Sequence, residues 1–184
     1  MPRVQIPDDF AQDPTSYVWS RFAPEVGAAA GGFMLAVYEN CALSVREMEA
    51  ARYRTAHLNG CKLCINMRAA RDLPGLIERS GGNPAKAAAR KGPDPDEAFY
   101  AAIADWRTSP VLTERERMAA EYADRLGQSP KSMEEDDGFW QQMHAVFSDA
   151  EIVDLSFAIA MWMGFGRLTH ALELDNVCMP TALS

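Results

Sequence analysis

The chain has 184 residues, of which 48% are hydrophobic, and its formal net charge is −8. This length fits one domain, and the apolar content is enough to form a buried core. Residues 93–184 hold most of the negative charge, with 6 Lys and Arg against 17 Asp and Glu. Nucleic acid and anionic membrane surfaces are therefore not expected partners.

The first ten residues, MPRVQIPDDF, lack the basic and apolar pattern of a signal peptide. The longest apolar run, residues 155–165, is too short to span a bilayer. We therefore expect a cytoplasmic protein with no membrane partner. In that reducing compartment, closely spaced cysteines more often cycle between redox states than hold a fold together.

Residues 1–16 are polar and contain Pro2, Pro7 and Pro14. We interpret them as an N-terminal arm, followed by one helical domain over residues 17–184. The domain is expected to begin with a short helical turn, and Pro24 suits the first turn of a helix that reaches about residue 40.

A Ser-x-x-Glu capping box at residues 44–47 predicts the start of the next helix, and the Asn-Gly pair at 59–60 predicts its end. Glu49 lies at the edge of the apolar stripe of this helix. Partial desolvation there would raise the pKa of its carboxyl group toward the range useful for proton transfer. An ordinary ion pair with Arg46 or Arg52, three residues away on either side, is the alternative.

Cys61 and Cys64 follow this helix and lie three residues apart at the start of another, on adjacent positions of one face. They can therefore form a disulfide or share a metal ion. Thiols at a helix start face unpaired N–H groups and the positive end of the helix dipole, which favour the reactive thiolate. His57 either reaches these thiols or interacts with the C-terminal end of its own helix.

Other interpretations of the cysteine pair remain open. The two side chains are buried and unreactive in one, because free cysteine is among the most buried residue types, and the same role is expected for Cys41 and Cys178. A structural zinc site is another, and its four ligands would have to include His57, Cys41 or Cys178. A thioredoxin-type motif requires flanking strands, and no strand pattern occurs beside this pair.

The cysteine helix is expected to end before the Pro-Gly pair at residues 74–75. Pro95 suits the first turn of a following helix. Three more helices are predicted to begin at the capping boxes of residues 113–116, 132–135 and 148–151.

The last helix, residues 152–174, is apolar on nearly all sides. It should therefore be buried all round, in part against another subunit. His170 and Arg167 lie near its end, where we expect surface or helix-terminal charges.

The spacing of Glu49, eleven residues and then Cys61-x-x-Cys64, with an Asn-Gly pair before the first cysteine, resembles the alkylhydroperoxidase D (AhpD-like) branch of the carboxymuconolactone decarboxylase family. Residues 112–116 and the run from Phe147 resemble the later helices of that family. The resemblance covers the chain from about residue 20 onward. It implies an all-α, AhpD-like bundle of about six to eight helices, in a single domain that forms homo-oligomers.

The resemblance also implies a thiol-dependent peroxidase. Cys64 would be oxidised by a hydroperoxide to the sulfenic acid, and Cys61 would then close the disulfide. An external dithiol or a thiol protein would reduce it. Glu49 would manage the protons, and no metal or organic cofactor is implied.

Arg68 marks a departure from the family pattern, which has a histidine four residues after the second cysteine. On one continuous helix Arg68 would share a face with Cys64, and its fixed charge would lower the pKa of that thiol. Arginine does not exchange protons near neutral pH. The proton would then come from Glu49, His57 or water, and slow peroxide turnover is expected.

Two other functions are kept open. One is a lyase or isomerase that acts on a small lactone or carboxylic acid, as in the decarboxylase branch of the family. The paired thiols argue against it, because that branch does not rely on a C-x-x-C motif. The other is a non-catalytic redox sensor or helical oligomerisation module, which the departure at Arg68 allows.

Overall fold

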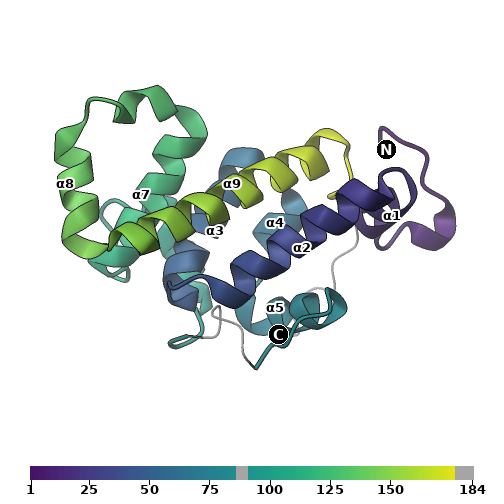
Figure 1. Cartoon of the computed structure of the whole chain (residues 1–184), viewed down its shortest axis with the longest axis horizontal. Coiled ribbons are helices and arrows are strands. Elements are labelled where there is room, and N and C mark those ends of the chain that lie inside the picture. Colours follow the sequence, from purple (N-terminus) through teal and green to yellow (C-terminus); the bar gives the residue numbers. More distant parts are fainter. Residues whose placement is uncertain (86–90, 177–184) are drawn as a thin grey trace.

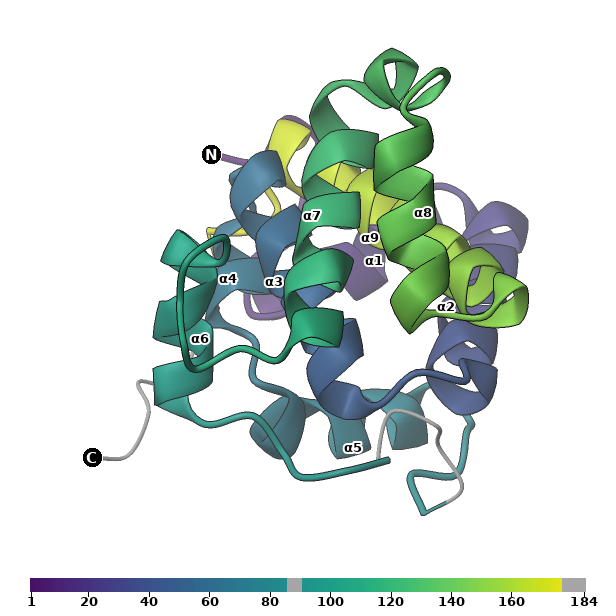
Figure 2. The ribbon, with the colours of Figure 1, turned by 90° about the vertical axis from the view of Figure 1, so that its left-hand side faces the viewer.

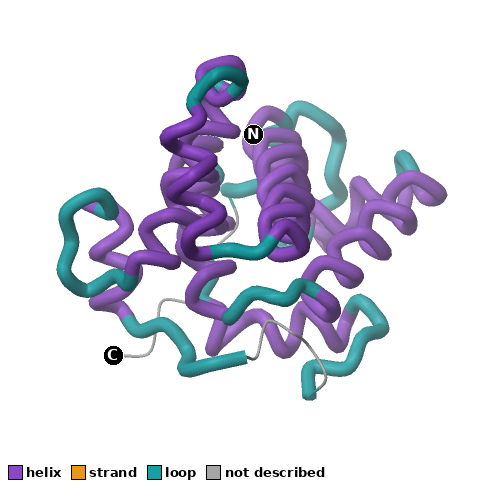
Figure 3. Tube along the Cα trace, turned by 60° about the vertical axis from the view of Figure 1, so that its left-hand side comes forward, coloured by secondary structure: helices purple, strands orange, loops and turns teal. Residues whose placement is uncertain are grey.

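The computed structural model describes residues 1–85 and 91–176 of the chain. Within these ranges the structure holds nine α-helices and no strand. Figure 3 shows the helices joined by loops and turns. The predicted all-α class is confirmed. The helix number slightly exceeds the expected six to eight, and three of the helices have eight residues or fewer. The α-helices are α1 (Pro14–Arg21), α2 (Pro24–Asn40), α3 (Val45–Asn59), α4 (Lys62–Asn66), α5 (Ala69–Arg79), α6 (Glu97–Ala102), α7 (Glu114–Gln128), α8 (Asp137–Val146) and α9 (Asp149–Ala171). Short 3₁₀ turns occur at η1 (Asp8–Phe10), η3 (Ile103–Asp105) and η4 (Pro130–Met133).

Helix α3 is the centre of the bundle and packs against both α7 and α9 (Figures 1 and 2). Its capping box is present, with the Ser44 hydroxyl and the Glu47 carboxylate each bound to the other residue's N–H. The same box opens α7 at Thr113 and α9 at Ser148. These three predicted helix starts are confirmed, because a capping box is decided by residues within one turn.

The predicted capping box at residues 132–135 is wrong. Pro130–Met133 form a 3₁₀ turn, and the next helix begins at Asp137. The carboxylate of Asp136 accepts the N–H of Phe139 at 3.0 Å, so this aspartate is the N-cap.

The core lies where α3 meets α7 and α9, and α5, α6 and α8 contribute further side chains to it. Its largest fully buried apolar residues are Leu43, Met48, Leu73, Ile77, Phe99, Ile103, Met143, Leu155 and Ile159. Leu73 and Ile77 lie four residues apart on α5, as do Leu155 and Ile159 on α9, which is expected for helix faces that are directed inward.

Within the single chain α9 is not buried all round, and the part of its burial expected from another subunit stays a prediction. Val153, Phe157 and Leu168 on its outer side are 52%, 56% and 41% exposed. By length and composition alone α9 could cross a membrane, but half of its most apolar window is buried inside the protein. A core helix of a soluble protein behaves in this way.

The N-terminal arm folds back on the end of α9. The N-terminal ammonium and the Arg3 guanidinium both bind the carboxylate of Glu173. The Arg3 N–H also donates to the Leu172 carbonyl at 3.0 Å. Helix α1 then starts at Pro14, with Asp13 as its N-cap.

The cysteine helix is shorter than predicted. Helix α4 ends at Asn66, Met67 and Arg68 are extended, and α5 follows with Pro74 in its interior. The expectation that one helix runs from the cysteines to Pro74 and stops there is therefore wrong. As a result, Arg68 is the N-cap residue of α5 and does not share a helix face with Cys64.

Candidate functional site

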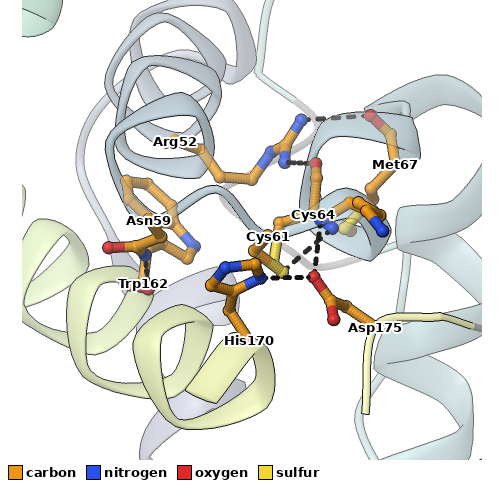
Figure 4. The surroundings of a disulfide bond; sticks show 9 residues. Arg52, Asn59, Cys61, Cys64, Met67, Trp162, His170 and Asp175 are labelled. Carbon is orange, nitrogen blue, oxygen red and sulfur yellow. Dashed lines mark hydrogen bonds and ion pairs between the residues drawn. A yellow bond between two sulfur atoms is a disulfide. The ribbon is translucent and has the colours of Figure 1, made fainter. Parts of the chain in front are cut away.

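The candidate site is the junction between α3 and α4, where Cys61 and Cys64 form a disulfide (Figure 4). Their Cα atoms are 5.2 Å apart. Gly60 ends α3 with a φ of 65°, the left-handed conformation that the Asn-Gly pair predicted. The Sγ atom of Cys61 accepts the N–H of Cys64 at 3.3 Å, which makes Cys61 the N-cap of α4. Two cysteines at N-cap and N3 are thus close enough to be joined, as expected.

The two cysteines differ in exposure. Cys61 is 0% exposed, whereas Cys64 is partly exposed. A reagent that approaches from solvent therefore meets Cys64 first. Because thiol–disulfide exchange requires access to the attacked sulfur, this asymmetry suits Cys64 for contact with an external partner and Cys61 for an internal step.

Glu49 is almost fully buried on α3, and its carboxylate is bound by Arg52. The Arg52 Nε and Nη2 atoms donate to the two carboxylate oxygens at 2.5 and 2.8 Å. Tyr100 donates its hydroxyl to Glu49 at 2.8 Å. Burial and the charge of Glu49 raise the pKa of the Tyr100 hydroxyl, so it stays a donor. The ion pair with Arg52, one of the two interpretations of Glu49, is thus present.

Arg52 also reaches across the junction to the cysteine helix. Its guanidinium donates to the carbonyl oxygens of Cys64 at 2.6 Å and Met67 at 3.1 Å (Figure 4). These acceptors are at the C-terminal end of α4, where carbonyls lack intrahelical partners. Arg52 therefore fixes α4 against α3, and the Glu49 carboxylate compensates its buried charge.

Arg68 follows the end of α4, and its guanidinium contacts groups other than the two cysteine sulfurs. Its guanidinium binds Glu97 at 2.7 Å and the Ile65 carbonyl at 2.8 Å, and it lies 4.3 Å from the ring centroid of Tyr100. Among the hydrogen bonds of the described residues, none joins Arg68 to either sulfur. The expectation that Arg68 shares a helix face with Cys64 is wrong, because α4 ends at Asn66, and the effect of its charge on the Cys64 thiol stays a prediction.

His57 is exposed on the last turn of α3, and its ring packs edge-on against Tyr53 with centroids 4.7 Å apart. Partial desolvation of the ring, together with the charges of Arg54 and Arg52, lowers the pKa of the imidazole. No contact of the described residues joins His57 to the disulfide, so its role there stays a prediction.

His170 is a residue of this junction that the sequence interpretation treated as a surface or helix-terminal charge. Its Nδ1 lies 2.9 Å from the Asp175 carboxylate, which also accepts the N–H of Lys62 at 2.9 Å (Figure 4). A Cβ atom at Gly60 would be 3.4 Å from His170 Nε2. The one available signal was an aspartate five residues after a histidine at a helix end, and this signal is weak.

Cys41 is buried at the end of α2 and lies apart from the disulfide. Burial raises the pKa of its thiol to about 11, so it is protonated and unreactive near neutral pH. The expected apolar role of Cys41 agrees with this environment, and Cys178 lies outside the described residues. Within residues 1–85 and 91–176, no three His, Cys, Asp or Glu side chains are grouped to hold a metal ion.

Fold and site together define an all-α protein with a C-x-x-C disulfide at a helix junction. No family model matches the chain. A curated relative, the uncharacterised protein YnjA of Escherichia coli strain K12, is 25% identical over 130 residues, or 71% of this chain. The chain spans about three fifths of that relative's length, since the matched part is 59% of it.

A solved structure from Agrobacterium tumefaciens has the same fold. It is ATU0492, described as a protein of unknown function and provisionally as an antioxidant defence protein AhpD. The TM-score is 0.65 at 23% identity, and the match covers 88% of this chain and 97% of that one. The chain therefore has an AhpD-like fold, as the spacing of Glu49, Cys61 and Cys64 predicted.

Proposed function

We propose that the protein is a cytoplasmic, thiol-dependent peroxidase that acts on hydroperoxides. The observation that carries the proposal is the pair formed by the accessible Cys64 and the enclosed Cys61 at the start of α4. The Cys64 sulfur can contact a substrate, and the Cys61 sulfur lies close enough to form a bond with it afterwards. The AhpD-like fold agrees with this function.

In the proposed reaction the Cys64 thiolate attacks one peroxide oxygen. An S–O bond forms as the O–O bond breaks, and the alkoxide leaves as an alcohol with one proton. Cys61 then attacks the sulfenic sulfur, so that an S–S bond forms and water leaves. An external dithiol or thiol protein returns both cysteines to thiols and is itself oxidised.

The remaining predicted site residues have defined places in this proposal. Glu49 supports the junction through its ion pair with Arg52. Arg68 binds the carbonyls of Ile65 and Met67 and so helps to hold the end of α4. His57 is an exposed base at the end of α3.

The test is a titration of the reduced protein with an alkyl hydroperoxide while free thiols are counted. Loss of two thiols per chain, followed by turnover when a dithiol is added, supports the proposal. Cys64→Ser should abolish thiol loss, and Cys61→Ser should stop at the sulfenic acid. The buried Cys41 offers a matched control, because Cys41→Ser should leave turnover unchanged.

The same titration separates the alternatives. A lyase of the decarboxylase type would lose no thiols, and a non-catalytic redox sensor would lose two without turnover. Either result would overturn the proposal that the protein is a peroxidase.

We also propose that the protein is a homo-oligomer that associates through α2 and α9. Helices α2 and α9 pack against each other, and they carry the exposed apolar residues Val26 and Phe33 on α2 and Val153 and Phe157 on α9. The rings of Phe33 and Phe157 are 6.3 Å apart, so the two helices form one continuous apolar face.

A second copy of the chain is the occupant that suits this face. At a net charge of −8 two copies repel one another, and a contact surface that carries little charge adds least to this repulsion. Asp154 at the edge of the face is bound to the N–H of Ala42 at 2.8 Å, which partly compensates its charge.

A further inference from the structure

The imidazole of His170 is packed against the residue that precedes Cys61. Nε2 would lie 3.4 Å from a Cβ atom at Gly60, and Figure 4 shows the ring beside the Cys61 end of the disulfide. We propose that His170 moves the proton of Cys61 during disulfide closure and that Asp175 positions its ring. Where closure follows oxidation of Cys64 by a hydroperoxide, this inference rests on the proposed function.

Asp175 determines which ring nitrogen is free. It is 3% exposed, and its Oδ2 atom accepts both the Lys62 N–H and the Nδ1–H of His170 at 2.9 Å. Burial acts to raise the pKa of Asp175, but the hydrogen bonds from His170 and Lys62 outweigh it, so the pKa is below its usual range. An ionised Asp175 holds Nδ1 as a donor, and Nε2 is left to accept a proton on the side of Gly60.

The two side chains that the sequence suggested as proton sources have other contacts. Glu49 is bound by Arg52 and Tyr100, and the His57 ring packs against Tyr53 on the last turn of α3. The chain has three histidines. His144 belongs to α8, where it pairs with Asp149 at 3.3 Å, so it lies on a different part of the bundle.

Asp175 is the charged group that is bound to the His170 ring. Other titratable or charged groups lie on the neighbouring helices and segments. They are Arg167 on α9, which donates to the Gly127 carbonyl; Lys62 on α4, which donates to Asn176; Glu173, which binds Arg3 and the N-terminal ammonium; and His57 on α3.

The closing step balances as follows. When Cys64 is a sulfenic acid, Nε2 of His170 takes the Cys61 proton, and the Cys61 thiolate attacks the Cys64 sulfur. The S–S bond forms as the S–O bond breaks, and hydroxide leaves as water with the proton that His170 returns. His170 is neutral again at the end, so it needs no further partner.

His170→Gln tests this assignment in the full-length reduced protein. After addition of a hydroperoxide, samples are quenched with a reagent that traps sulfenic acids, and intact mass separates the sulfenic acid from the disulfide. We expect closure to slow about a hundredfold, the lower end of the range for general acid–base catalysis. Loss of the Cys64 thiol in the first step should be unchanged.

His144→Gln is the matched control, because it makes the same change at a histidine that also pairs with an aspartate, and it should close like the wild type. Asp175→Asn keeps an acceptor for Lys62 but removes the charge that orients the ring. It should also slow closure, and the acidic limb of the pH–rate profile should move to lower pH because a positive ring is less favoured.

Starting disulfide closure with oxidised glutathione, in place of a hydroperoxide, distinguishes a failure of the proposed function from a failure of this inference. If hydroperoxide leaves Cys64 unreacted, the mixed disulfide on Cys64 still presents Cys61 with a sulfur to attack, and glutathione leaves. Slower closure in both His170→Gln and Asp175→Asn, with an unchanged His144→Gln, supports the inference. Equal closure rates in wild type and His170→Gln overturn it, whatever the result with hydroperoxide.

Discussion

Arg52 is bound by both carboxylate oxygens of Glu49, and the two side chains are 3% and 2% exposed. The pair lies three residues apart on the central helix and connects it to the carbonyls of Cys64 and Met67. A buried charge without its partner is costly, whereas loss of both charges removes that penalty.

We therefore expect Glu49→Leu and Arg52→Met each to lower the free energy of unfolding by about 3 to 5 kcal/mol, because each leaves one buried charge unpaired. The double variant should lose less than the sum of the two, by about 1 kcal/mol or more. Urea unfolding of the four proteins gives this cycle. Glu121→Gln, in the more exposed pair with Arg125, should cost less than about 1 kcal/mol. Strict additivity would contradict a coupled pair.

Arg68→His places the histidine of the family pattern into this chain. Because the side chain at residue 68 points to Glu97 and not to the sulfurs, we expect the alkylation rate of reduced Cys64 to change little. Stability should fall by about 1 kcal/mol, since hydrogen bonds to the carbonyls of Ile65 and Met67 are lost. Glu97→Gln serves as the control for the ion pair alone. A tenfold change in alkylation would restore the idea that Arg68 acts on the thiol.

Phe157→Glu introduces a charge into the apolar face of α2 and α9. If two copies meet there, the variant should shift the protein from oligomer to monomer, because a buried unpaired carboxylate disfavours the interface. Light scattering at micromolar concentration measures the mass. Val111→Glu makes the same change at another exposed apolar residue and should leave the mass unchanged. A wild-type protein that is already monomeric would exclude the association.

Asp175 should make stability depend on acid. Its folded-state pKa lies below the ordinary value, so its contribution is present above about pH 4, the unfolded value, and is lost as pH falls through the lower folded value. The stability difference between wild type and Asp175→Asn should therefore be largest near pH 7 and shrink in acid. Urea unfolding at several pH values measures it. A difference that stays constant with pH would mean that the carboxylate charge contributes nothing.

The helix starts could be predicted because their signals are local. Ser44, Thr113 and Ser148 each bind the N–H of a residue one turn on, and that spacing is visible in the sequence. The box at 132–135 failed because Asp136, a competing cap a few residues later, binds the N–H of Phe139.

The end of α4 could not be predicted because the groups that produce it are remote. The apolar spacing continues through Met67, but the carbonyls of Cys64 and Met67 are taken by Arg52 from α3. Arg68 donates its N–H to Asp72 at 2.8 Å and so begins a new helix without a capping side chain of its own. No pattern within one turn of residue 66 carries this information.

The cysteine motif gave the site itself, but its surroundings depend on tertiary contacts. Cys61, Cys64 and Gly60 form the junction that their spacing predicted. His170 joins them from α9 only because the last helix crosses α3. Its partner Asp175 follows the helix end, where sequence periodicity says nothing about direction.

Gly60 adopts a φ of 65°, which is strained for most residues with a side chain. A Cβ atom there would lie 3.4 Å from the His170 ring, an ordinary van der Waals distance, so the backbone conformation is what restricts this position. Asparagine accepts the left-handed conformation more readily than other residues with a side chain. Lys62, two residues on, has an exposed side chain, so a library of random substitutions should retain many residues at 62 and few except glycine and asparagine at 60.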